Sequence, residues 1–155
     1  MPASWLEHRI PPLLLVLLSA LAMAACAGLL GEYSLHFAGQ GKLAGLVMLL
    51  GISVMLAAAI QFRRARTTVD PRSPEAASAL VTGGVFRFSR NPMYLGMALL
   101  LLGWGLFLGN LPGLLLVAGF VIWINRFQIA PEERALAARF GPAFARYCGE
   151  TRRWI

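Results

Sequence analysis

Apolar residues fall into four long blocks separated by short polar segments, at residues 12–30, 43–62, 93–108 and 112–129. A bilayer core of about 30 Å needs about 20 helical residues, which the blocks approach. The third block is the shortest and is rich in glycine, so we expect it to pack closely against a neighbour or to begin in the interface. The pattern predicts an all-α integral membrane protein with four transmembrane helices.

The basic residues predict the orientation of these helices. All but one of the 14 Lys and Arg residues lie in the N-terminal tail or in residues 63–90 and 126–153, and Lys42 is the exception. The positive-inside rule therefore predicts that both termini and the central loop are cytoplasmic.

Polar segments beside the spans are expected to form interfacial structure. Glu75 to Leu80 is predicted to be a brief helix, which Gly83 and Gly84 end with a tight turn or a close approach to a ligand. Pro131 is predicted to start another helix, with Glu132 and Glu133 favoured in its first turn by the helix dipole.

The predicted C-terminal helix is amphipathic. Its apolar stripe is Leu136, Phe140, Phe144 and Tyr147. Gly141 and Pro142 should kink or split the helix, and residues 152–154 are expected to anchor the chain at lipid headgroups.

Composition agrees with a single membrane domain over residues 1–155. The chain is 58% hydrophobic and 14% charged, with a mean hydropathy of +0.67, which is too apolar for an ordinary soluble domain. The net charge of +7 would also suit nucleic acid, but the basic residues flank the spans and form no nucleic-acid module. Anionic membrane lipids are the expected partners, and no nucleic acid is expected.

Cysteine and histidine suggest no further chemistry. Cys26 and Cys148 fall on opposite sides of the predicted topology, which argues against a disulfide. Residues 21–26 resemble a lipoprotein processing site, but the charged start is weak, so a retained first helix is expected. His36 lies near Glu32 without further ligands, so no metal site is predicted.

Two polar clusters bracket the last hydrophobic hairpin. They are residues 87–94, with the sequence Arg-Phe-Ser-Arg-Asn-Pro-Met-Tyr, and residues 132–134, Glu-Glu-Arg. An out-and-back crossing brings both to one membrane face, where arginine, amide, phenol and carboxylate groups suit a zwitterionic ligand. The alternative is that the arginines pair with lipid phosphates, the glutamates cap a helix and Pro92 merely starts the third span.

The motifs of residues 80–96, residues 131–136, Phe140-Gly141 and Tyr147 resemble the isoprenylcysteine carboxyl methyltransferase and phospholipid methyltransferase group of membrane enzymes. The resemblance covers residues 68–154 as a cofactor-binding core and leaves residues 12–62 as variable N-terminal helices. It implies a cytosolic S-adenosylmethionine site without a Rossmann fold, and S-adenosylhomocysteine as the product. The cofactor contacts that it implies are Ser78, Ala79, Leu80, Val81, Phe86, Arg90, Asn91, Pro92, Met93, Tyr94 and Glu132.

Two positions depart from the family pattern, one on the cofactor side and one on the substrate side. The family's common Arg-His-Pro is Arg-Asn-Pro here, and Asn91 cannot be a general base near neutral pH. Gln128 occupies the position of an arginine that the isoprenylcysteine enzymes associate with substrate, and Arg126 could compensate for it. Glu133 is the candidate base for an amine or thiol acceptor, while a carboxylate needs none. The acceptor is expected to be lipophilic: a prenylcysteine-like carboxylate, a lipid amine or a small hydrophobic molecule.

Other functions stay open. Membrane sterol reductases that use NADPH share a similar C-terminal region but are far longer. A non-enzymatic packing subunit would be favoured by the pairs Gly41/Gly45, Gly105/Gly109 and Gly109/Gly113. An ion-coupled exporter is disfavoured because no acidic residue lies in the four apolar blocks. Abundant Ala, Leu, Gly and Arg with one Lys suggest a GC-rich bacterial genome and hence the inner membrane.

Overall fold

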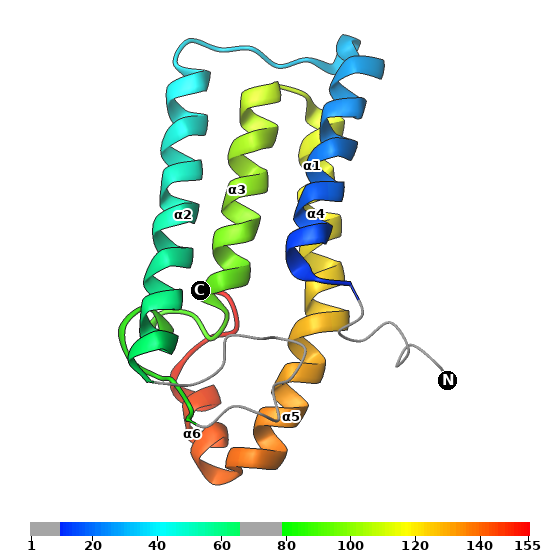
Figure 1. The fold of residues 1–155 in the computed structure, drawn as a ribbon. Coiled ribbons are helices and arrows are strands. Elements are labelled where there is room, and N and C mark those ends of the chain that lie inside the picture. The colour runs from blue at the N-terminus through cyan, green and yellow to red at the C-terminus, as the bar shows by residue number, and fades with distance from the viewer. Residues whose placement is uncertain (1–9, 66–78) are drawn as a thin grey trace, which may run out of the picture.

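Four apolar helices form an elongated bundle in the computed structural model, which describes residues 10–65 and 79–155 (Figure 1). The bundle helices are α1 (Pro12–Leu29), α2 (Gln40–Arg64), α3 (Pro92–Leu108) and α4 (Leu111–Ile124). Short 3₁₀ turns, η2 (Gly31–Tyr33) and η4 (Gly84–Arg87), precede α2 and α3. Beyond α4 follow the π-helical turn η5 (Asn125–Ile129), α5 (Ala130–Phe140) and α6 (Pro142–Glu150). The predicted helical class is confirmed.

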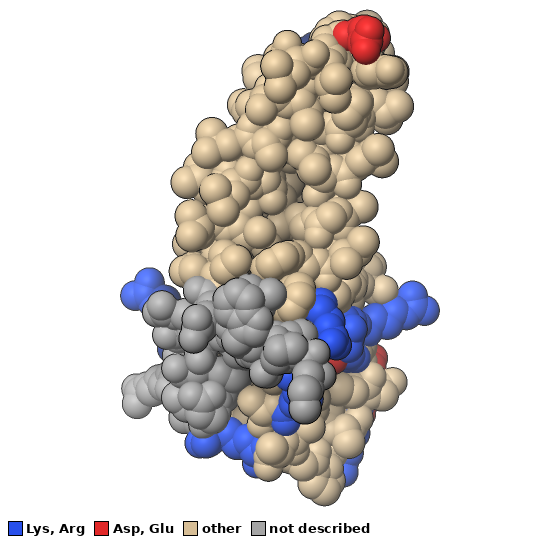
Figure 2. Space-filling model, turned by 90° about the vertical axis from the view of Figure 1, so that its right-hand side faces the viewer, with Lys and Arg blue, Asp and Glu red and all other residues tan. Residues whose placement is uncertain are grey.

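Within the described residues, three helices are long and apolar enough to cross a membrane: α1 with 18 residues, α2 with 25, and the continuous helix Leu111–Phe140 with 30. Helix α3, the remaining member of the bundle, is also apolar but is shorter, with 17 residues. Leucine and isoleucine side chains along α1, α2 and α4 are exposed, as expected for a surface that faces lipid. Figure 2 shows this uncharged surface, with basic side chains gathered toward the end that carries α5 and α6.

The last bundle helix differs from its prediction. Residues 112–129 were expected to end before a separate helix starting at Pro131, but one helix continues from α4 through η5 into α5. Proline has no N–H to donate and its ring crowds the carbonyl four residues earlier, so it ordinarily interrupts a helix. Here the helix widens into a π turn just before Pro131, and the Ala130 N–H donates to the Asn125 carbonyl. Glu132 and Glu133 therefore do not cap a free helix end.

Helices α2 and α3 form the most extensive helix pair of the bundle. A Cβ atom built on Gly96 would lie 2.6 Å from the carbonyl oxygen of Gly51, and one built on Gly103 would lie 2.9 Å from that of Ala44. The backbones thus touch where glycine leaves room. This confirms the close packing expected of the glycine-rich third helix.

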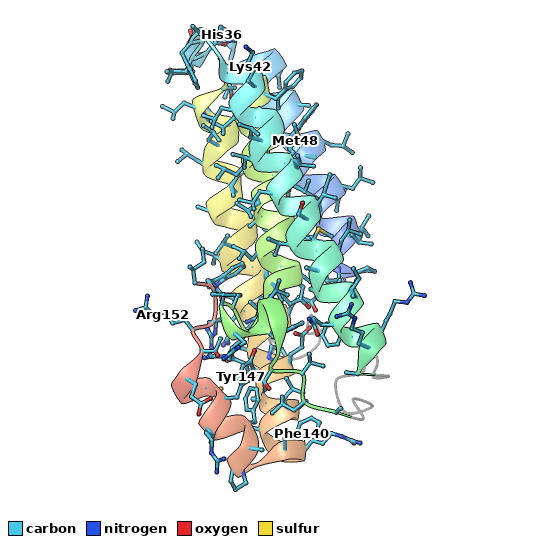
Figure 3. All side chains as sticks on the ribbon, turned by 90° about the vertical axis from the view of Figure 1, so that its left-hand side faces the viewer. His36, Lys42, Met48, Phe140, Tyr147 and Arg152 are labelled. Atoms are coloured by element: carbon cyan, nitrogen blue, oxygen red, sulfur yellow. The ribbon has the colours of Figure 1, made fainter. Side chains whose placement is uncertain are left out.

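At the opposite end of the bundle, side-chain amides close the loops. Asn110 caps α4 by accepting from the Gly113 N–H at 3.0 Å, and it donates to the Leu30 carbonyl at 2.9 Å. Gln40 donates to the Leu106 carbonyl at 2.6 Å. His36 and Lys42 also lie at this end (Figure 3). These bonds engage backbone groups at the helix ends: the Gly113 N–H, the Leu30 carbonyl and the Leu106 carbonyl, which also accepts from the Gly109 N–H at 3.2 Å.

The N-terminal tail and the central loop are described only in part. The short helix predicted over residues 75–80 falls mostly outside the described residues, and residues 79–80 are not helical. The predicted split at Gly141 is confirmed, because this residue has φ 49° and separates α5 from α6. The number of membrane crossings and their orientation stay predictions.

Gly96→Ala tests the close packing of α2 and α3. The new methyl group would lie 2.3 Å from Met55 Cγ as well as against Gly51, so we expect a loss of about 1–3 kcal/mol in stability. Gly45→Ala on α2 is the control, since nothing lies within 4 Å of its Cβ position. Thermal unfolding in detergent compares the two, and equal midpoints would contradict the packing described.

Candidate active site at the polar end of the bundle

The segment before α3 carries the first polar cluster into the bundle. Pro92 is fully buried in the first turn of α3, where the missing N–H costs nothing. The Ser89 hydroxyl, which is also buried, accepts from the Asn91 N–H at 3.1 Å. This local bond shapes the turn from which Arg90, Asn91 and Tyr94 project.

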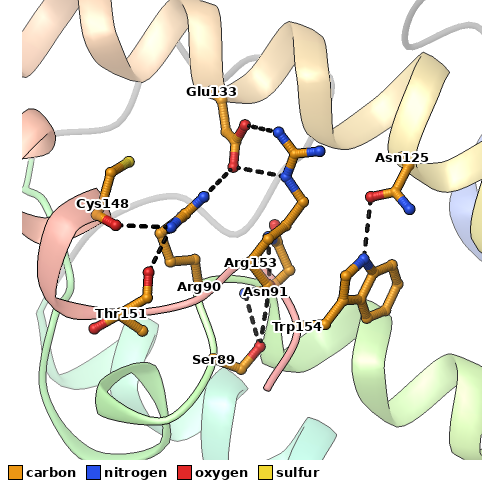
Figure 4. Close-up of polar contacts among 9 residues, drawn as sticks. All are labelled: Ser89, Arg90, Asn91, Asn125, Glu133, Cys148, Thr151, Arg153 and Trp154. Atoms are coloured by element: carbon orange, nitrogen blue, oxygen red, sulfur yellow. Dashed lines mark hydrogen bonds and ion pairs between the residues drawn. The ribbon is translucent and has the colours of Figure 1, made fainter.

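Glu133 joins the two polar clusters through ion pairs (Figure 4). Arg90 Nη2 lies 2.9 Å from Glu133 Oε1, and Arg153 donates to both carboxylate oxygens, at 3.1 Å from Nε and 2.5 Å from Nη2. Arg90 Nη1 also donates to the carbonyl oxygens of Cys148 and Thr151. Both carboxylate oxygens are engaged by guanidinium groups, which suits Glu133 to anchoring, and its role as a base stays a prediction.

Tyr94 and Glu132 make the second bridge between the clusters. The buried Tyr94 hydroxyl donates to Glu132 Oε1. Tyr94 belongs to the main apolar cluster of the bundle, together with Met97, Leu101 and Ile129. The neighbouring glutamates of α5 therefore have different partners: Glu132 bonds to α3, and Glu133 bonds to the arginines.

The C-terminal segment lies across the first cluster. The Arg153 carbonyl accepts from Asn91 Nδ2 at 3.0 Å and from the Ser89 hydroxyl at 3.4 Å, and the Arg90 N–H donates to the Arg152 carbonyl at 2.9 Å. Trp154 donates to Asn125 Oδ1 at 3.1 Å and packs on the main apolar cluster. Arg153 and Trp154 thus have partners within the protein, and their predicted role as a headgroup anchor stays a prediction. The side chain of Arg152 points outward (Figure 3).

A second apolar cluster lies beside these polar groups. Its buried members are Ala58, Phe86, Phe144 and Tyr147, with Leu80, Val81, Met93, Leu136 and Phe140 packed against them. The predicted apolar stripe of the C-terminal helices is confirmed. Leu80, Val81, Phe86 and Met93 thus meet as side chains in one cluster, next to Ala79 in the preceding loop, while Ser78 lies outside the described residues.

Tyr147 fastens η4 to α6. Its hydroxyl donates to the Phe86 carbonyl at 2.7 Å. Burial raises the pKa of Tyr147 above its ordinary value, so the hydroxyl stays protonated and remains a donor at neutral pH. Gly84 lies close to Gln61: it has φ 61°, and a Cβ there would lie 2.1 Å from Gln61 Nε2.

The two residues expected on the acceptor side differ in their exposure to solvent. Arg126 is exposed, whereas Gln128 is buried and donates to the Ile10 carbonyl at 2.9 Å. The structure does not bring Arg126 into the network of Figure 4. Among the described residues, the buried side-chain atoms without a hydrogen-bond partner are Gln128 Oε1 and Arg90 Nε, both at positions expected to contact a ligand.

A family model described as phospholipid methyltransferase matches residues 40–143. The chain belongs to the phospholipid methyltransferase family. It is also 48% identical over 63 residues to an uncharacterized protein of Haemophilus influenzae, a match that covers 41% of this chain and all of that relative. No solved structure matches the chain.

Membership of the phospholipid methyltransferase family agrees with a membrane methyltransferase built on apolar helices. The matched residues include both polar clusters but end before the C-terminal segment. Sequence motifs accordingly missed Thr151, Arg153 and Trp154 as parts of the site. Arg153 is 20 residues from Glu133 in the sequence, so nothing local indicated the contact.

Tyr147→Phe tests the connection between η4 and α6. Loss of the hydroxyl leaves the Phe86 carbonyl without its donor, so we expect about 1 kcal/mol of destabilisation. Tyr33→Phe, at an exposed tyrosine of η2, is the matched control. Chemical unfolding in detergent measures both, and an unchanged midpoint for Tyr147→Phe would argue against the bond.

Proposed function

We propose that this protein transfers a methyl group from S-adenosylmethionine to a lipophilic acceptor at the cytosolic face of the bacterial inner membrane. In this proposal all four bundle helices span the membrane, and both termini lie in the cytoplasm. The observation that carries the proposal is the junction of the two polar clusters by the Tyr94–Glu132 and Arg90–Glu133 contacts. Family membership supports methyl transfer.

The side chains at this junction fit the cofactor's chemistry. Arg90 Nε is a buried donor without a protein partner, which suits a carboxylate. Glu132 offers a carboxylate toward an ammonium or sulfonium group. The cluster of Leu80, Val81, Phe86 and Met93 offers apolar surface to an adenine ring.

Bound S-adenosylmethionine would supply an electrophilic methyl group on a positively charged sulfur. The task of this chain is to orient the reactants in line and to exclude water. Tyr94 fixes the Glu132 carboxylate, and Arg90 holds Glu133 so that α5 cannot turn away from α3. Arg126 and Gln128 are proposed to face the acceptor, whose chemical class is left to experiment.

Cofactor binding is tested with S-adenosylhomocysteine and purified protein by calorimetry. We expect wild-type protein to bind, and Glu132→Ala and Tyr94→Phe each to weaken binding about tenfold, which corresponds to about 1.4 kcal/mol. Glu32→Ala and Tyr33→Phe, at exposed residues of η2, are matched controls and should bind normally. Full binding by both site variants would refute the assignment, and no binding by wild-type protein would favour a non-enzymatic membrane protein.

Labelled cofactor tests the transfer itself. Membranes containing the protein should acquire a methylated, lipid-extractable product when incubated with S-adenosylmethionine carrying a labelled methyl group, and identification of the product names the acceptor. Membranes with Glu132→Ala should form at least tenfold less. Label confined to water-soluble products would contradict a lipophilic acceptor.

A further inference from the structure

Arg153 is bound to both polar clusters at once. Its guanidinium group holds the Glu133 carboxylate of α5, while its backbone carbonyl accepts from Ser89 and Asn91 ahead of α3. Its neighbours add to the same attachment, since the carbonyl oxygens of Thr151 and Arg152 both accept from Arg90. The C-terminal segment thus lies between the two motifs rather than beside them (Figure 4).

The ion pairs of Glu133 with the two arginines are partly shielded from solvent. The side chains of Arg90 and Glu133 are 13% and 20% exposed, whereas that of Arg153 is 41% exposed. Two arginines surround one carboxylate, and the geometry of Arg153 is bidentate, which fixes direction as well as charge. The ion pairs of Glu133 also fix the position of Glu132, because Glu132 is the preceding residue on α5.

We propose that Arg153 is a positioning residue of the cofactor site, which sets the separation of the Arg90–Tyr94 segment and the Glu132–Glu133 pair. The inference rests on the proposed function and adds to it a part of the chain beyond the residues that the family model matches. Arg153 acts through Glu133 and Asn91, so it shapes the binding site without contacting the cofactor itself.

The test compares neighbouring arginines in full-length protein. Calorimetry with S-adenosylhomocysteine should show about tenfold weaker binding for Arg153→Ala and about threefold for Arg153→Lys, since lysine keeps the charge but lacks the planar fork. Arg152→Ala should bind as wild-type, because its side chain is exposed. Thermal unfolding is measured beside it, and binding is compared well below each midpoint.

A double-mutant comparison separates positioning from general stability. If Arg153 acts through Glu133, Arg153→Ala should weaken binding less than twofold further in a Glu133→Gln background. If Arg153→Ala does not fold, Arg153→Lys decides: normal affinity in that variant overturns the proposal. Arg153→Ala that binds normally, or Arg152→Ala that binds as weakly as Arg153→Ala, also overturns it. Wild-type protein that does not bind overturns the proposed function together with this inference.

Discussion

A carboxylate held between two guanidinium groups connects the parts of this protein that are distant in sequence. Glu133, Arg90 and Arg153 come from α5, from the turn before α3 and from the C-terminal segment. Charges at the edge of an apolar bundle are costly unless they neutralise one another, so each of these segments is held where its partner lies. Because Arg90 and Arg153 both pair with Glu133, the adjacent Glu132 bonds instead with Tyr94.

Helix packing within the apolar bundle sets the position of this polar network. The glycine contacts hold α2 close against α3, and Phe62 near the end of α2 meets Phe86 of η4 with ring centroids 5.0 Å apart. Phe86 is fixed in turn by Tyr147 of α6. Apolar packing within the bundle thus helps to position the segments that surround the polar site.

Local patterns in the sequence were sufficient for some features and not for others. Apolar blocks predicted the helices, and the hairpin between the clusters predicted that Tyr94 and Glu132 would lie near each other. The continuity of the helix through Pro131 was not predictable, because proline ordinarily marks a helix start and the π turn that accommodates it has no sequence signature. The contacts of Arg153 were missed for a different reason: a basic residue beside tryptophan is typical of a headgroup anchor, and only the tertiary structure reveals its partners.

The π turn of η5 has a consequence for the spacing of residues along this helix. A π turn holds more residues than an α-helical turn, so an α-helical wheel drawn from Ile124 assigns the wrong faces to everything after Ile129. Removing one residue from η5 would leave an ordinary α-helical turn, so Glu132 and Glu133 would keep nearly the same faces relative to α4. The same deletion within α4, where no turn holds an extra residue, would instead rotate both glutamates by about 100° relative to the start of that helix.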